Sequence, residues 1–122
     1  MAAYRVEGDA IPAPLAAAGD AGRGREIAFG REANCLLCHA VPDAGRHPVG
    51  NLGPPLGGVG ARLSAGQLRL RVVDSTRLNP QTIMPSYYRV TGLERVGAPW
   101  RGKPILTAQQ VEDVVAYLLT LR

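Results

Sequence analysis

The sequence predicts an all-α fold of short helices separated by long loops. Residues 64–67 and 107–110 each carry the capping-box pattern that begins a helix. After the second box, apolar side chains recur at the three- and four-residue spacing of a helix with one buried face. These are Val111, Val114, Val115, Leu118 and Leu119. With 15 glycines, 10 prolines and six aromatic residues among 122, the chain is one domain with little aromatic mass for its core.

Three stretches are predicted to lack regular structure because they are rich in glycine and proline. Residues 1–19 predict an extended N-terminal arm ahead of a domain that spans residues 20–122. Residues 41–60 hold four prolines and six glycines and show no periodicity. A further loop begins at residue 79 and contains Met84.

The first predicted helix begins after Asp20, a good N-cap residue, and runs up to the cysteine motif described below. Gly22, Gly24 and Gly30 weaken this helix. Two explanations of the glycines stay open. Gly24 and Ala28 can form a small face against which another helix packs closely, or the helix is simply frayed.

The second predicted helix runs from its cap at Ser64 toward Asp74. Leucine, arginine and valine alternate over residues 68–72, which would also suit a strand. The capping box favours the helix.

The segment Cys35-Leu36-Leu37-Cys38-His39 contains both cysteines of the chain and one of its two histidines. C-x-x-C-H is the attachment signature of a c-type haem. On a helical turn, residues three apart share a face, so the two sulfurs can reach both vinyl-bearing corners of one porphyrin edge. The histidine can then offer a nitrogen to the iron.

Other chemistries fit this motif less well. A structural zinc site needs four protein ligands, commonly in two pairs, and the chain has no second pair. A thioredoxin-like dithiol lies beside a βαβ pattern, which is not apparent here. The sequence therefore predicts one covalently bound haem c, whose apolar bulk would complete the core.

Met84 is the predicted second iron ligand, 45 positions after His39. Its thioether is soft and uncharged, and His/Met ligation is typical of cytochromes c. His47 is a rival, but only seven residues separate it from His39, and Lys103 is a remote third. We also expect the carbonyl of Pro54 to accept the Nδ1–H of His39 and so fix its tautomer. With both axial positions filled, the iron would exchange electrons and bind no substrate.

The formal net charge of +4 is modest, and the propionates of a bound haem would offset about half of it. No run of like charge occurs, which argues against nucleic-acid binding and favours a solvated surface over a steering patch. The longest near-apolar stretch, residues 114–119, is too short to span a bilayer. The scattered basic residues are Arg62, Arg69, Arg71, Arg77, Arg89, Arg95, Arg101 and Lys103.

Residues 1–5 lack the apolar region of a secretory signal. Bacteria attach haem to C-x-x-C-H on the far side of the inner membrane. We therefore expect a periplasmic protein whose leader has been removed.

Several segments of the chain resemble class I cytochromes c, and more narrowly the X subunits of the SoxAX cytochrome complex of bacterial sulfur oxidation. The resemblance covers roughly residues 20–122. Its general parts are the haem motif, residues 50–54 and the C-terminal helix. Its more specific parts are DSTRLNPQTIMP at 74–85, YYRV at 87–90 and RGKPILTAQ at 101–109.

This resemblance implies a class I cytochrome c fold with thioether links at Cys35 and Cys38 and axial ligands His39 and Met84. It also implies a heterodimer with a SoxA-type haem subunit that holds the active site. That complex oxidatively joins thiosulfate to a cysteine of a carrier protein, an L-cysteine S-thiosulfotransferase type of activity. The present chain would accept the electrons singly and pass them to a small soluble cytochrome c. With no third cysteine, it would have no separate catalytic site.

Two other functions stay open at this point. One is a free-standing electron carrier, although the sign-mixed charges argue against the charge ring typical of such carriers. The other is a catalytic haem protein with an open iron site. Tyr87, Tyr88 and Trp100 could line either a docking face or the haem pocket.

Overall fold

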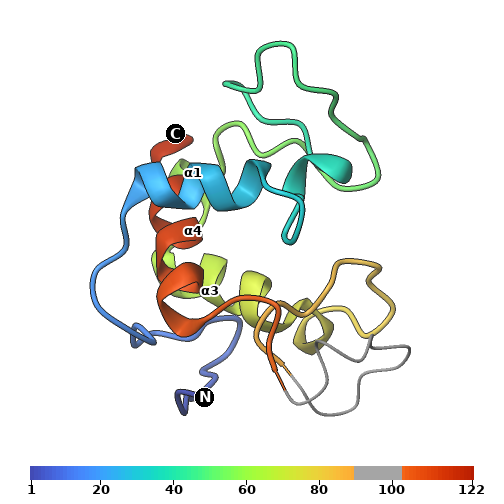
Figure 1. Cartoon of the computed structure of the whole chain (residues 1–122). Coiled ribbons are helices and arrows are strands. Elements are labelled where there is room, and N and C mark those ends of the chain that lie inside the picture. Colours follow the sequence, from blue (N-terminus) through green and yellow to red (C-terminus); the bar gives the residue numbers. More distant parts are fainter. Residues whose placement is uncertain (90–102) are drawn as a thin grey trace.

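The computed structural model describes residues 1–89 and 103–122, and helices are its only regular elements apart from one isolated β-bridge between Glu7 and Ala10. The all-α prediction is confirmed (Figure 1). None of the helices in these two ranges is long and apolar enough to cross a bilayer. The elements are α1 (Ala21–Phe29), η1 (Cys35–Leu37), α2 (Val59–Arg62), α3 (Ala65–Asp74), η2 (Ser75–Arg77) and α4 (Ala108–Thr120), where η marks a 3₁₀-helix.

Helix α1 begins where the sequence predicts, with the Asp20 side chain accepting a hydrogen bond from the backbone N–H of Arg23 at 2.8 Å. The helix ends at Phe29, so the prediction that it runs up to the cysteine motif is wrong. Gly30 takes an extended conformation (φ −78°, ψ 169°), and its N–H bonds back to the carbonyl of Ile27. This conformation stops the helix and lets the chain turn before the motif begins.

Helix α1 packs closely across α4, which explains the glycine in its middle. A Cβ on Gly24 would overlap the backbone carbonyl of Asp113, and Ala28 is 1% exposed. The small face formed by Gly24 and Ala28 is therefore a helix–helix contact, and the frayed-helix explanation is wrong.

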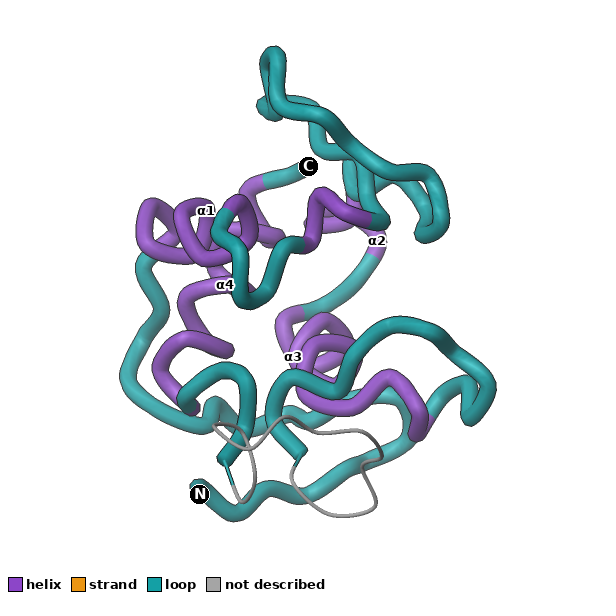
Figure 2. The backbone as a smooth tube through the Cα atoms, turned by 45° about the vertical axis from the view of Figure 1, so that its right-hand side comes forward, coloured by secondary structure: helices purple, strands orange, loops and turns teal. Residues whose placement is uncertain are grey.

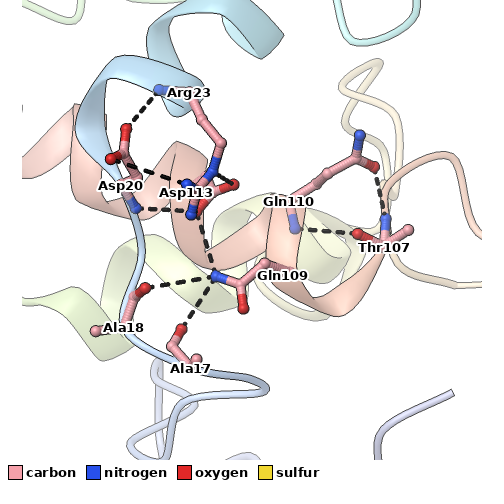
Figure 3. A network of polar contacts seen from close by, with 8 residues as sticks. All are labelled: Ala17, Ala18, Asp20, Arg23, Thr107, Gln109, Gln110 and Asp113. Atoms are coloured by element: carbon pink, nitrogen blue, oxygen red, sulfur yellow. Dashed lines mark hydrogen bonds and ion pairs between the residues drawn. The ribbon is translucent and has the colours of Figure 1, made fainter.

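Polar contacts reinforce the same crossing (Figure 3). The Asp113 carboxylate accepts hydrogen bonds from the backbone N–H of Asp20 at 2.9 Å and from Arg23 Nε at 3.1 Å. Gln109 donates from the same helix to the carbonyl of Ala17 at 3.2 Å. Helix α4 thus holds both the start of α1 and the chain that leads into it.

Both predicted capping boxes are present. Ser64 and Gln67 bond reciprocally at the start of α3, and Thr107 and Gln110 do so at the start of α4. The strand alternative for residues 68–72 is wrong. Helix α2 was not predicted: it begins inside the glycine-rich stretch and is a single turn.

The N-terminal arm lies against the core. Figure 1 shows it passing below α3 and α4 before it rises to α1. Ile11 is fully buried, and its carbonyl accepts a 2.7 Å hydrogen bond from Arg69 Nη1. The rest of the Arg69 guanidinium forms a buried ion pair with Glu112, which also accepts from the backbone N–H of Leu15. The prediction that Arg69 belongs to a solvated surface is wrong, because it pairs α3 with α4 beneath the arm.

Candidate haem site

An apolar cavity of about 270 Å³ lies between η1, the loop that follows it, α2, α3 and α4. In Figure 2, α1 lies in the upper part of the view and α3 in the lower part, and α4 passes from one level to the other. The walls carry Leu56, Val59, Leu63, Leu68, Val72, Leu106, Val114 and Leu118 from segments far apart in the sequence. A second cavity of about 170 Å³ shares several lining residues with the first and so adjoins it.

The two cysteines lie on and just after the helical turn η1, as predicted. Asn34 takes a left-handed conformation (φ 45°) and directs the chain into the turn. The N–H groups of Cys38 and His39 then both bond to the carbonyl of Cys35. Cys35 lines both cavities and Cys38 lines the second. Both thiols are free, and burial raises the pKa of Cys35 to about 11.

The His39 ring is held by the loop opposite η1. Its Nδ1 lies 2.7 Å from the Pro54 carbonyl oxygen. A carbonyl can only accept, so Nδ1 carries the hydrogen, and in the neutral ring the lone pair is then on Nε2. A Cβ on Gly53 would lie 2.7 Å from the same Nδ1, so a residue without a side chain is needed there. The expected hydrogen bond from His39 to Pro54 is present, and it leaves Nε2 available to a metal.

Met84 lines both cavities, together with His39. Its Sδ lies 3.3 Å from Ser75 Oγ, which is also 2.6 Å from the carbonyl of Arg71. The Met84 backbone N–H bonds to Thr82 Oγ1 at 3.2 Å. The thioether therefore sits where α3 ends, at the wall of the space that His39 also borders.

A buried carboxylate that the sequence analysis missed braces the Met84 loop. Asp74 is 5% exposed, and its Oδ1 accepts from Ser86 Oγ at 2.8 Å and from Arg89 Nη1 at 3.4 Å. It also accepts from the backbone N–H and the hydroxyl of Thr76. Burial raises the pKa of Asp74, but the hydrogen bonds from Thr76 and Ser86 and the charge of Arg89 outweigh it and hold the pKa below its usual value. No local signal separates this aspartate from an ordinary C-terminal helix residue.

Neither rival ligand borders the two cavities. His47 packs its ring edge-on against Phe29, with 5.1 Å between ring centroids. Lys103 lines neither cavity.

Of the aromatic side chains that could line either the haem pocket or a docking face, one lies at the cavities and one in the core. Tyr87 lines both cavities and donates to the carbonyl of Ala33 at 2.6 Å. Tyr88 is buried and its hydroxyl accepts from the backbone N–H of Ala2. Trp100, Arg95 and Arg101 lie outside the described residues.

This arrangement fits a haem c. Cys35, Cys38, His39 and Met84 all line the smaller cavity, and all of them except Cys38 also line the larger, apolar one. Nowhere in residues 1–89 and 103–122 do three or more His, Cys, Asp or Glu side chains come together to hold a metal ion, which disfavours the zinc alternative. No strand accompanies the cysteines in the same ranges, so the βαβ setting of a redox dithiol is missing there.

Comparisons with known proteins agree with this geometry. The sequence matches the cytochrome c family over residues 21–122. A chain in the crystal structure of SoxXA from P. pantotrophus superposes with a TM-score of 0.88 at 36% identity, covering 97% of this chain and 93% of that one. The c-type cytochrome SorU from Sinorhizobium meliloti superposes with a TM-score of 0.53 at 29% identity, covering 82% and 87%. Among curated proteins, none matches the chain.

Proposed function

Because this chain belongs to the cytochrome c family, we propose that it is the electron-transfer haem subunit of a SoxXA-type complex. The cofactor of the family is covalently bound haem c. One observation carries the proposal: the similarity to the SoxXA chain extends over 97% of the sequence and so includes most of the N-terminal arm. The likeness to SorU is weaker and covers less of the chain.

We assign four residues to haem attachment and iron ligation. Cys35 and Cys38 would form the thioether links, and His39 Nε2 and Met84 Sδ would fill the two axial positions. The haem supplies a one-electron Fe(III)/Fe(II) couple when bound. The support is that all four residues line the smaller of the two adjoining cavities and that the Pro54 carbonyl already orients the His39 ring.

The protein would do the rest by excluding water and fixing geometry. The largely apolar walls would shield a bound haem and its two iron ligands from water. The Pro54 carbonyl holds the imidazole in one tautomer, and the Asp74 contacts hold the loop that carries Met84. With both axial groups supplied by the chain, no position is left for a substrate, so the site would only accept and release electrons.

The proposed partner is a SoxA-type haem subunit in a heterodimer. Together the two would couple thiosulfate oxidatively to a carrier-protein cysteine, and this subunit would pass the released electrons, one at a time, to a small cytochrome c. The place of action would be the periplasm, since haem attachment to C-x-x-C-H occurs there in bacteria. This chain has no third cysteine, so the sulfur chemistry would belong to the partner.

Co-expression with the SoxA-type subunit of the source organism tests the proposal. The tagged partner should retain this chain in equimolar amount, and gel filtration should show one heterodimer peak that contains both haems. A SorU-type cytochrome expressed in parallel controls for nonspecific association. Elution of this chain as a monomer that does not bind the partner would favour a free-standing electron carrier and overturn the proposal.

A further inference from the structure

Ser75 lies where α3 passes into η2, and its side chain borders the larger cavity although it is only 8% exposed. Among the described residues that line this cavity, Ser75 and Tyr87 are the two that carry a hydroxyl group. Tyr87 donates its one hydroxyl hydrogen to the carbonyl of Ala33 at 2.6 Å. The Ser75 hydroxyl is therefore the one that can serve another group at the cavity wall.

The Ser75 hydroxyl lies between two acceptors and has a single hydrogen. Its Oγ is 2.6 Å from the carbonyl oxygen of Arg71 and 3.3 Å from the Met84 Sδ. A carbonyl oxygen and a thioether sulfur both accept, and neither donates. The two groups therefore compete for one hydrogen, and rotation about the Cβ–Oγ bond of Ser75 moves that hydrogen from one to the other.

Thr82 is the second hydroxyl residue beside Met84, but it contacts the backbone and not the sulfur. Its Oγ1 accepts from the Met84 N–H at 3.2 Å. Within residues 1–89 and 103–122, Ser75 is the only residue that forms a hydrogen bond with the sulfur. Thr82 thus holds the loop that carries Met84, whereas Ser75 contacts the atom that we assign to the iron.

We propose that Ser75 is a positioning residue that favours the reduced site, because it directs its hydrogen to the Met84 sulfur in the reduced state and to the Arg71 carbonyl in the oxidised state. A sulfur bound to ferric iron gives up more electron density than one bound to ferrous iron, so it is the weaker acceptor. The Arg71 carbonyl is the same in both states. Hydrogen bonds to the groups around a haem iron are one means by which a protein sets its potential. The bond to sulfur, stronger in the reduced state, therefore raises the midpoint potential.

Four variants of the haem-loaded chain separate the hydroxyl from the space that it fills. Ser75→Ala removes the hydroxyl and Ser75→Thr keeps one. Ser75→Val has nearly the shape of the threonine variant but no hydroxyl. Ser86→Ala is the matched control, because Ser86 is 7% exposed and lies two positions after Met84, yet donates to Asp74 and not to the sulfur.

Redox titration should give a lower midpoint potential for Ser75→Ala and Ser75→Val, and a potential near that of the unchanged protein for Ser75→Thr. Infrared difference spectra between the reduced and oxidised states should contain an O–H stretching band that moves in D₂O. This band should be present in the unchanged protein and in Ser75→Thr, and absent from the other two variants at this position. Ser86→Ala should lower the stability in urea but keep both the potential and the band.

Equal potentials in Ser75→Thr and Ser75→Val would overturn the proposal, and so would equal shifts in Ser75→Ala and Ser86→Ala. Where the threonine or valine variant fails to fold, the two alanine variants decide by the second criterion. The inference rests on the Met84 ligation of the proposed function, but not on the partner subunit. Absence of the near-infrared methionine band from the unchanged protein would overturn that ligation and this inference together. A band that is present, with potentials that do not change, would overturn the role of Ser75 alone.

Discussion

Arg69 and Glu112 form a two-point ion pair in the core, with Nε and Nη2 each 2.8 Å from a carboxylate oxygen and both side chains 5% exposed. The pair joins α3 to α4 and also holds the backbone of the arm at Ile11 and Leu15. Burying two charges carries a large desolvation cost, which the pair offsets only while both members are present.

Glu112→Ala should therefore lower the free energy of unfolding by about 3–5 kcal/mol, because it leaves Arg69 buried and unpaired. Urea unfolding followed by far-UV circular dichroism measures the change. The double variant Arg69→Met/Glu112→Leu removes both charges and should recover much of the loss. If Glu112→Ala lowers the free energy of unfolding by less than about 1 kcal/mol, the unpaired Arg69 guanidinium reaches solvent and the prediction is wrong.

Met84→Ala should abolish the weak near-infrared absorption band of a methionine sulfur bound to ferric iron. It should also lower the midpoint potential and open the iron to cyanide and carbon monoxide, because His/Met ligation stabilises ferrous iron. Absorption spectroscopy and redox titration measure both effects. His47→Ala is the matched control and should keep the band. A band that survives Met84→Ala would remove Met84 from the iron.

Gly24→Ala should destabilise the protein by about 1–3 kcal/mol, because the added methyl group forces α1 away from the Asp113 backbone. Gly22→Ala makes the same chemical change in the same helix, where the nearest atom is the Asp20 carboxylate at 3.2 Å. It should stay within about 1 kcal/mol of the unchanged protein, since alanine favours the helix. Thermal unfolding of both variants makes the comparison, and equal stabilities would contradict the close crossing.

Asp74→Asn should reduce stability at neutral pH by about 1–3 kcal/mol, because the bonds from Ser86 and Thr76 lose their charged acceptor. The pKa of Asp74 is lowered in the folded state, so its contribution is complete at neutral pH and disappears as the pH falls below the unfolded value of about 3.9. The unfolding free energy of Asp74→Asn should therefore fall less steeply below pH 4. Acid titrations of both proteins, with the near-infrared band as a second signal, measure this. Parallel titration curves for the unchanged protein and Asp74→Asn would rule out a stabilising role of the Asp74 carboxylate.

The sequence predicted local features well because local chemistry determines them. The caps at Asp20, Ser64 and Thr107 begin helices, since each satisfies backbone N–H groups only a few residues away. The cysteine motif lies on a helical turn that also closes locally, through hydrogen bonds from the N–H groups of Cys38 and His39 to the carbonyl of Cys35. The hydrogen bond from His39 to Pro54 spans a loop of 15 positions and could still be expected from haem chemistry.

Long-range features could not be predicted in this way. Arg69 looks like any exposed helix arginine until its partner, 43 positions later, is placed beside it. The hydrogen bonding of Asp74 likewise depends on Ser86 and Arg89, which follow the Met84 loop and lie beside Asp74 only once that loop is folded. The end of α1 at Phe29 depends on the backbone conformation of Gly30, which composition alone does not specify.

The contact between α1 and α4 has a consequence for the order of folding. Asp20 and Asp113 are 93 positions apart, so the two helices can meet only after nearly the whole polypeptide has been synthesised. The segment with Cys35 and Cys38 lies between these two residues in the sequence, so it belongs to the long loop that this contact closes. We therefore expect haem to be joined to these cysteines most readily before the contact between α1 and α4 has formed.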